Sequence, residues 1–304
     1  MRQIIRNFAR ESRRRELFWR YGFNFFPSLN YRFGAAQGAP DEAVRRIVGR
    51  LDRDGIAVAS IDELPGAQAV FDELDAKTKR ILEQRGDELH RLSLQANDAE
   101  RIGEKTFNVE LLGSEVEFNP DSVFARFALQ ESFLNIANAY FRMLVKLRYY
   151  NVWLTFATHG APRESQLWHF DREDNYILKI FVYLRDVDAG TGPFTYAPKT
   201  HRKGVLCGAE PEYFVEKGVR RTTDRQMSEV VAPEFWIKAT GKKGTVVFAD
   251  TRGYHKGGEA RLADRLMFTC MFTSPASESK RLLKFAPNLM LTHLNKKQIS
   301  ALEI

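Results

Sequence analysis

Apolar residues at helical spacing dominate the first half of the chain. After a suitable N-cap at Asp41, one face of residues 42–52 collects four aliphatic side chains, which is the pattern of an amphipathic helix. We predict helices over residues 42–52, 62–84 and 130–147, the second with a break near Pro65-Gly66. A short strand is predicted over residues 56–59. Residues 87–120 are polar and carry no clear pattern.

From Tyr149 onwards, short runs rich in β-branched and aromatic residues replace the helical pattern. Glycine, proline and aspartate separate the runs, which is typical of a sandwich or barrel. We predict strands over residues 150–157, 177–184, 194–197, 245–249 and 266–274. The expected fold is therefore mainly β with flanking helices (α+β), followed by a partly helical tail over 281–304.

Alternation along two of these strands separates one face from the other. Over 177–184, aliphatic residues alternate with Lys179, Phe181 and Tyr183. Over 266–274, large apolar residues alternate with a series that starts at Arg265. Two interpretations are open. Lys179 and Arg265 line a barrel that holds an anionic small molecule, or they lie at strand ends and reach water.

The positive charge is concentrated at the N-terminus. The chain of 304 residues carries a net charge of +7, and residues 1–40 contain eight arginines and two glutamates, a balance of +6. A nearly neutral remainder argues against an extended nucleic-acid surface. The chain has two cysteines and no uncharged apolar run near the roughly 20 residues that span a bilayer. We expect a cytoplasmic protein without a disulfide framework.

Residues 1–40 also contain seven aromatic side chains between Phe8 and Phe26, but no apolar core of a secretory signal. Three interpretations are open for this N-terminal extension. It is a basic amphipathic helix that contacts an anionic membrane or a partner, a mitochondrial-type presequence, or a packed extension with a solvated charged face. The two glutamates and few serines argue against the presequence. We treat 41–304 as a single domain, whose oligomeric state the sequence leaves open.

The sequence contains one His-x-Asp motif, His169-Phe170-Asp171. In an extended segment residues i and i+2 point the same way, so that His169 and Asp171 can chelate one metal ion. His255 is the best-placed third ligand, because it follows a predicted buried strand and precedes the strand that carries Arg265. Two histidines and one carboxylate suit Fe(II) in an oxygenase, although zinc accepts the same ligands.

Several segments together resemble the phytanoyl-CoA dioxygenase family of Fe(II)/2-oxoglutarate oxygenases. The resemblance covers roughly residues 44–275 and rests on the segments 51–58, 166–171, 181–188, 190–194 and 197–204, completed by His255 and, ten residues later, Arg265. The most specific is the block from the His-x-Asp motif to Pro198-Lys199-Thr200-His201. The family often has Pro-Gly-Ser-His there, so this chain departs from the pattern at Lys199, and a structural role for His201 is favoured.

The resemblance implies a double-stranded β-helix (jelly-roll, cupin-like) core over 148–280, with a mainly helical part before it at 41–147. It implies that His169, Asp171 and His255 hold Fe(II) and that Arg265 binds the distal carboxylate of 2-oxoglutarate, with Arg261 as the competing candidate. Lys179 is expected to help hold this cosubstrate. O2 would be the second cosubstrate, and ascorbate would support activity.

The implied reaction is hydroxylation of a C–H bond of a small-molecule metabolite, with release of succinate and CO2. In related halogenases a small residue replaces the carboxylate ligand, so an intact Asp171 favours hydroxylation or desaturation. The alternatives are a non-catalytic jelly-roll binding or regulatory protein and another cupin-like metalloenzyme. Residues 210–236 are the expected specificity region, in which Arg220, Arg221 and Arg225 either meet an anionic substrate or form a solvated basic loop.

Overall fold

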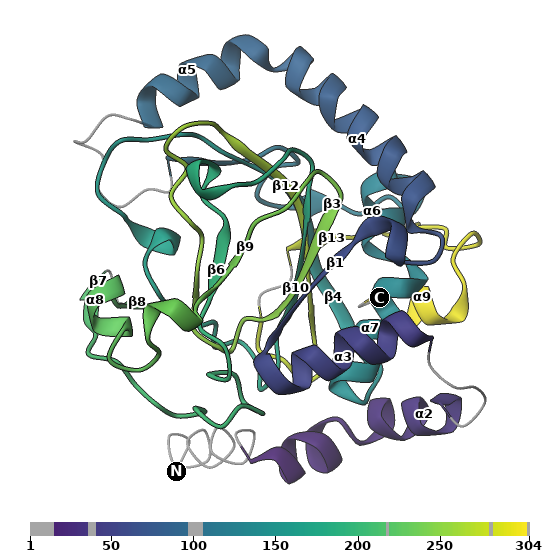
Figure 1. Ribbon diagram of the computed structural model, residues 1–304. Coiled ribbons are helices and arrows are strands. Elements are labelled where there is room, and N and C mark those ends of the chain that lie inside the picture. Colours follow the sequence, from purple (N-terminus) through teal and green to yellow (C-terminus); the bar gives the residue numbers. More distant parts are fainter. Residues whose placement is uncertain (1–14, 36–40, 97–105, 217–218, 280–281, 303–304) are drawn as a thin grey trace, which may run out of the picture.

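Two antiparallel β-sheets face each other and carry helices on one outer side (Figure 1). The computed structural model describes residues 15–35, 41–96, 106–216, 219–279 and 282–302. The larger sheet has the strand order β1-β10-β5-β12-β4-β2, and the smaller has the order β11-β6-β9. Every strand pair within these two sheets is antiparallel. This arrangement confirms the predicted mixed α+β fold with a jelly-roll core.

The strands are β1 Ile56–Ser60, β2 Asn108–Glu110, β3 Val116–Glu117, β4 Lys146–Thr155, β5 Leu178–Tyr183, β6 Phe194–Tyr196, β7 Phe214–Glu216, β8 Val219–Arg221, β9 Ile237–Ala239, β10 Thr245–Asp250, β11 His255–Lys256, β12 Arg265–Thr273 and β13 Leu283–Lys284. The α-helices are α2 Phe25–Ala35, α3 Glu42–Asp54, α4 Ala67–Gln84, α5 Gly86–Ala96, α6 Val123–Ala128, α7 Glu131–Phe141, α8 Asp224–Met227 and α9 Lys296–Ser300. Shorter helical turns are η1 Phe18–Phe23, η2 Ile61–Glu63, η3 Glu164–Gln166, η4 Ala189–Thr191 and η5 Pro233–Phe235.

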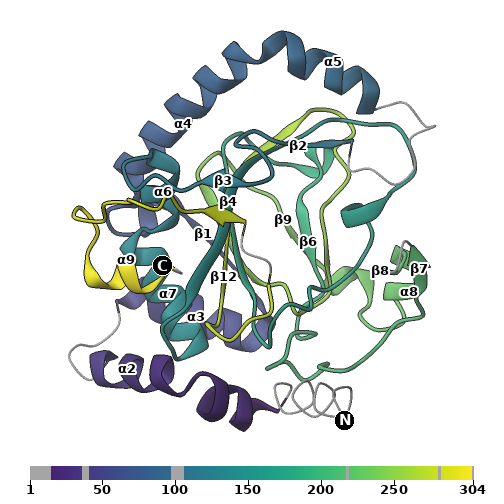
Figure 2. The same cartoon turned by 180° about the vertical axis from the view of Figure 1, so that it is seen from behind.

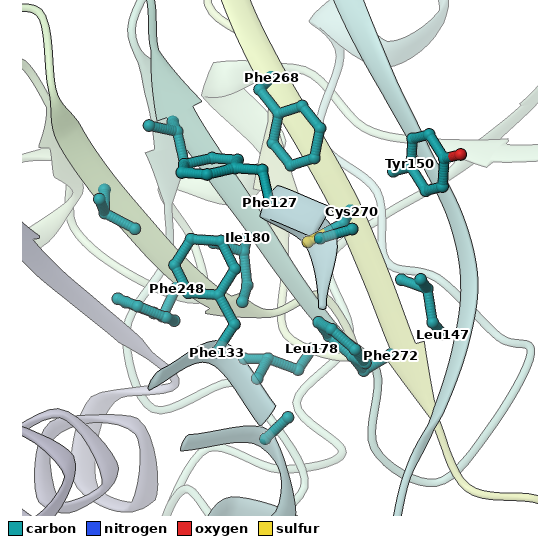
Figure 3. Close-up of a cluster of buried hydrophobic side chains, with 14 of the residues drawn as sticks. Phe127, Phe133, Leu147, Tyr150, Leu178, Ile180, Phe248, Phe268, Cys270 and Phe272 are labelled. Carbon is teal, nitrogen blue, oxygen red and sulfur yellow. The ribbon is translucent and has the colours of Figure 1, made fainter. Parts of the chain in front are cut away.

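Helices α3, α4, α6 and α7 cover the outer face of the larger sheet, and α4 and α5 follow one another as an arc (Figures 1 and 2). The main hydrophobic core lies under this helical layer. Phe127 of α6 contacts the rings of Phe133 and Phe268 edge to face, at centroid distances of 5.3 and 5.0 Å (Figure 3). Burial of such side chains supplies most of the driving force for folding.

The opposite face of the same sheet looks toward the smaller sheet. There a second, smaller cluster forms from Phe181 and Tyr183 of β5, Phe194 of β6 and Met267 of β12, among others. The alternation predicted from the sequence is confirmed, because the aliphatic residues of β5 and Phe268, Cys270 and Phe272 of β12 belong to the helix-covered core instead. The space between the sheets is the only place where β5 and β12 both present polar side chains.

Most predicted elements are confirmed within a few residues. Asp41 caps α3 by accepting from the Ala43 N–H at 3.0 Å, and Gly55 ends the helix in the left-handed conformation. The predicted helix over 130–147 is wrong at its C-terminal end. The helix stops at Phe141, Arg142 is left-handed with φ 53°, and β4 begins at Lys146. Pairing of β4 with β12 along its length outweighs the local helical preference.

The described part of the N-terminal extension packs against the body of the protein. Trp19 is 2% exposed and donates from Nε1 to Asp174 Oδ1 at 2.7 Å. The packed interpretation is therefore confirmed for residues 15–35, although on their outward face aromatic side chains accompany the exposed Arg15 and Arg32. Residues 1–14 and 36–40 lie outside the described residues. Within the described part of the chain, no helix is both long and apolar enough to cross a bilayer.

Candidate metal centre and cosubstrate pocket

His169, Asp171 and His255 come together from two separate segments of the chain. Their potential donor atoms all lie within 4.8 Å of one another. His169 and His255 face each other across an antiparallel bridge in which each backbone N–H donates to the other's carbonyl, at 3.0 and 2.9 Å. The Asp171 N–H donates to the Thr251 carbonyl at 2.8 Å. Backbone hydrogen bonds therefore fix all three residues without any metal.

Both imidazoles turn the same ring nitrogen toward the backbone. His169 Nδ1 lies 2.8 Å from the Leu167 carbonyl, and His255 Nδ1 lies 3.0 Å from the Gly253 carbonyl. Since a carbonyl oxygen only accepts, each Nδ1 must carry the proton. Nε2 is then the unprotonated nitrogen, the form in which an imidazole binds a metal ion.

The surroundings keep these ligands in their metal-binding protonation states. Burial lowers the pKa of His255 to about 4, and burial together with the neighbouring His255 lowers the pKa of His169 well below its usual value. Burial alone would raise the pKa of Asp171, but the Lys179 ammonium at 2.7 Å from Oδ2 holds it below its usual range. Two neutral imidazoles and one carboxylate result at neutral pH.

Arg265, the first residue of β12, is a buried cation that has no carboxylate partner among the described residues. It is 4% exposed, and no carboxylate in the described part of the chain forms an ion pair with it. Its guanidinium has only two long hydrogen bonds, both 3.4 Å, to the Gly258 carbonyl and Thr155 Oγ1, and Nε has no partner. Burial lowers its pKa. A buried, poorly satisfied guanidinium is costly unless a ligand carboxylate completes it.

One cavity of about 620 Å³ joins the three potential ligands and Arg265. Its apolar wall includes Trp153 and Phe181, and polar groups from β2 and β8 complete it. Its lining also includes Asn108, Glu110, Thr155, Arg172, Glu173, Arg220, Arg221, Met267 and Glu278. The volume is in the range of small-molecule sites.

Of the two arginines considered as cosubstrate ligands, only Arg265 lines this cavity. Arg261 donates to the carbonyls of Thr158 and Gly160, at 2.7 and 2.6 Å, and forms an ion pair with Glu259. Lys179 does line the cavity, but its ammonium is engaged by Asp171.

His201 does not join the three potential ligands. It is fully buried against the Gly55 turn, with Nε2 3.2 Å from the Asp52 carbonyl. This contact supports its structural role. Lys199, the residue that departs from the resembled motif, is left-handed with φ 66°, a conformation that glycine adopts more easily.

Sequence reasoning missed part of the cavity wall. Asn108 and Glu110 come from a segment without a clear pattern, and Trp153 and Thr155 could have been found from alternation along the β4 prediction. Arg221 is 6% exposed and paired with Glu164 at 3.5 Å, so the solvated-loop interpretation is wrong for it. Arg220 and Arg225 are exposed, and of these two only Arg220 lines the cavity.

Comparison with known proteins gives structural matches only. No protein-family model matches the chain, and no curated protein matches its sequence. Among solved structures, EctD from S. alaskensis with 2-oxoglutarate and 5-hydroxyectoine matches with a TM-score of 0.51 at 16% identity, covering 82% of this chain and 91% of that one. The same protein with bound Fe matches with a TM-score of 0.50 at 18% identity, over 82% and 84%.

The chain shares the fold of EctD. The epimerase SnoN, in complex with Fe3+, alpha ketoglutarate and nogalamycin RO, matches with a TM-score of 0.48 at 17% identity, over 79% of this chain and 87% of that one. At these identities the two EctD matches establish the fold alone, and the chemistry must be argued from the residues of the cavity.

Proposed function

We propose that this protein is an Fe(II)/2-oxoglutarate-dependent dioxygenase that hydroxylates a C–H bond of a small-molecule metabolite, releasing succinate and CO2. The observation that carries the proposal is the presence, in one cavity, of a two-histidine, one-carboxylate donor set and a buried arginine without an anion. The donor set fits Fe(II), and the guanidinium fits the distal carboxylate of 2-oxoglutarate.

Each residue has a defined task in this proposal. Nε2 of His169, Nε2 of His255 and the Asp171 carboxylate would hold the iron, which when bound supplies oxidative decarboxylation of the cosubstrate and activation of O2. Arg265 would orient 2-oxoglutarate through a bidentate carboxylate contact. EctD was crystallised with 2-oxoglutarate, and we carry over that cosubstrate but not its prime substrate.

Lys179 has a second task besides the predicted cosubstrate contact. Its ammonium lies 2.7 Å from Asp171 Oδ2, and both side chains are largely buried. This pairing keeps the carboxylate ionised, which is the form in which it binds a metal ion. Lys179 is thus a positioning residue for the metal ligand, and any contact with the cosubstrate uses its remaining N–H groups.

The carboxylate ligand also bears on the outcome of the reaction. With Asp171 present, a coordination position is not freed for halide, so we favour hydroxylation or desaturation over halogenation. Membership of the phytanoyl-CoA dioxygenase family and a cytoplasmic location remain predictions from the sequence. Ascorbate is expected to support turnover by keeping iron reduced.

Two other functions are less well supported by the residues of the cavity. A zinc hydrolase or isomerase on a cupin-like barrel has no need of an inward arginine such as Arg265. A binding or regulatory protein without turnover would not need two imidazoles whose Nε2 atoms converge with a carboxylate on one metal position.

The deciding experiment measures succinate formed by the purified protein with Fe(II), 2-oxoglutarate, ascorbate and air. We expect slow uncoupled turnover that is absent from Asp171→Ala. Anaerobic addition of 2-oxoglutarate to the Fe(II) protein should also produce a metal-to-ligand absorption band. If neither signal appears, the oxygenase proposal is wrong and a binding protein becomes the better explanation.

A further inference from the structure

The segment from Arg15 to Ala35, here called the aromatic strap, exposes much of its apolar side and buries polar residues against the protein, the opposite of an ordinary surface helix. Polar Asn24 and Ser28 are buried, at 0% and 2% exposed. Trp19 is buried, but most of the other large apolar side chains point outward, and those that are at least 44% exposed are Leu17, Phe18, Tyr21, Phe25, Phe26 and Phe33. A helix that packs only onto its own protein would bury such residues and expose the polar ones.

Polar contacts hold the strap in this orientation. Asn24 Nδ2 donates to the Trp19 carbonyl at 2.9 Å, and Asn24 Oδ1 accepts from the Ala276 N–H at 3.1 Å. Arg20 Nη1 donates to the Phe141 carbonyl at 2.8 Å, and the Trp19 indole donates to Asp174. The outward aromatic face is therefore a property of the docked strap and not of a loose end.

The charge of the strap matches an anionic surface. Its only acidic residue, Glu16, is paired with Arg20 and accepts from the Tyr176 hydroxyl. Arg15 and Arg32 are exposed beside the aromatic residues. The balance of +6 over residues 1–40 adds to this, since the rest of the chain is nearly neutral.

We propose that the aromatic strap binds the surface of an anionic phospholipid membrane. Its aromatic rings would enter the boundary between headgroups and acyl chains, while its arginines would contact lipid phosphates. The proposal goes beyond the oxygenase function and does not depend on it.

The strap is also linked to the mouth of the cavity. Asp174, which accepts from Trp19, also accepts from the Ser274 N–H at 2.7 Å. The loops on either side of these contacts contribute Arg172, Glu173 and Glu278 to the cavity wall. Membrane binding through the strap would therefore bring this side of the cavity close to the lipid surface.

The test is co-sedimentation of the full chain with vesicles of phosphatidylcholine alone and of phosphatidylcholine mixed with phosphatidylserine. We expect binding to the mixed vesicles that weakens with salt, and little binding to the neutral ones. The triple variant Phe18→Ser, Phe26→Ser, Phe33→Ser should lower the partition coefficient at least about tenfold. Arg15→Gln and Arg32→Gln should each lower it about fivefold.

A matched control removes equally exposed apolar residues elsewhere. Val205→Ser, Leu262→Ser and Met290→Ser, combined in one chain, should bind vesicles as the unchanged protein does. The proposal is overturned if the unchanged protein binds neither vesicle or if the strap variant binds like the control. It is also overturned if sedimentation shows a dimer that the strap variant abolishes without any vesicle binding, because a second copy of the chain is then the occupant.

Discussion

The two faces of β12 are built from neighbouring residues but serve different purposes. Phe268, Cys270 and Phe272 point under the helices, where they join a buried core rich in aromatic side chains (Figure 3). Arg265 and Met267 point between the sheets, where they line the cavity. One face contributes stability through burial, and the other holds a charge whose burial costs stability until a ligand arrives.

This contrast indicates that stability and chemistry can be separated residue by residue along a single strand. Substitutions on the helix-covered face should change the free energy of unfolding and leave ligand binding alone. Substitutions on the cavity face should change ligand binding and leave the free energy of unfolding nearly unchanged or higher. Four substitutions test this separation, two of them on β12 and two in the neighbouring cavity and helical layer.

The largest effect is expected at the cavity, from His255→Gln. Glutamine is close to histidine in size but does not replace the imidazole Nε2, so iron affinity and succinate formation should both fall more than about a hundredfold. The thermal midpoint of the metal-free protein should change little. Calorimetric titration with Fe(II) under anaerobic conditions and the succinate assay measure the two quantities. Retained iron affinity would remove His255 from the ligand set.

On the helix-covered face, Phe268→Ala should lower the free energy of unfolding by about 3–5 kcal/mol, because it leaves a void beside Phe127. The KM for 2-oxoglutarate should not change at a temperature where the variant is folded. Urea denaturation and succinate kinetics give the two values, with Phe268→Leu as a milder control. An altered KM with an unchanged urea midpoint would contradict the proposed division of the strand.

Replacing the buried cation tests the other face directly. Arg265→Met should raise the KM for 2-oxoglutarate about tenfold to a hundredfold, since a charge-assisted contact is lost. The free energy of unfolding should stay the same or increase, because an unpaired buried charge is removed. Arg261→Met is the matched control and should leave the KM unchanged. If the control raises the KM and Arg265→Met does not, the cosubstrate assignment moves to Arg261.

The smallest change in stability is expected at the ion pairs between Asp75 of α4 and the lysines Lys79 and Lys243. Burial alone would raise the pKa of Asp75 on α4, but Lys243 and Lys79, at 2.6 and 2.9 Å, hold it below its usual value. A lowered pKa in the folded state contributes stability above the unfolded pKa, which is lost as the pH falls through the folded pKa.

Asp75→Asn should therefore be less stable than the unchanged protein by about 1 kcal/mol at neutral pH. The difference should shrink below about pH 4, where the unfolded aspartate becomes protonated. Chemical denaturation across this pH range measures it, and the activity of the folded variant should be unaffected. A difference that grows on acidification would show that Asp75 acts in another way.

The sequence predicted features that depend on local pattern. The alternation of β5 and β12, the cap at Asp41 and the paired direction of His169 and Asp171 all follow from geometry within one element. His255 was grouped with these two because it follows a predicted buried strand and precedes the strand that carries Arg265. The family resemblance implied the same set, and the cavity brings the three together.

Features that depend on distant contacts could not be predicted. The early end of α7 at Phe141 follows from the pairing of β4 with β12, which lies far along the chain. The contribution of β2 to the cavity depends on its pairing with β4, and its own residues show no strand pattern. The burial of Asn24 in the aromatic strap depends on the Ala276 N–H, which only the folded body supplies, whereas Ser28 bonds within the strap to the Arg20 carbonyl.

The bridge between His169 and His255 has a consequence for how the protein is made. The two residues lie far apart in the sequence, and the bridge requires both. During translation, His169 and Asp171 are synthesised well before His255. Until His255 is added, the growing chain can bind a metal ion through only two of the three ligands. We expect metal loading to follow synthesis of nearly the whole chain. A truncated translation product would then compete poorly for cellular iron.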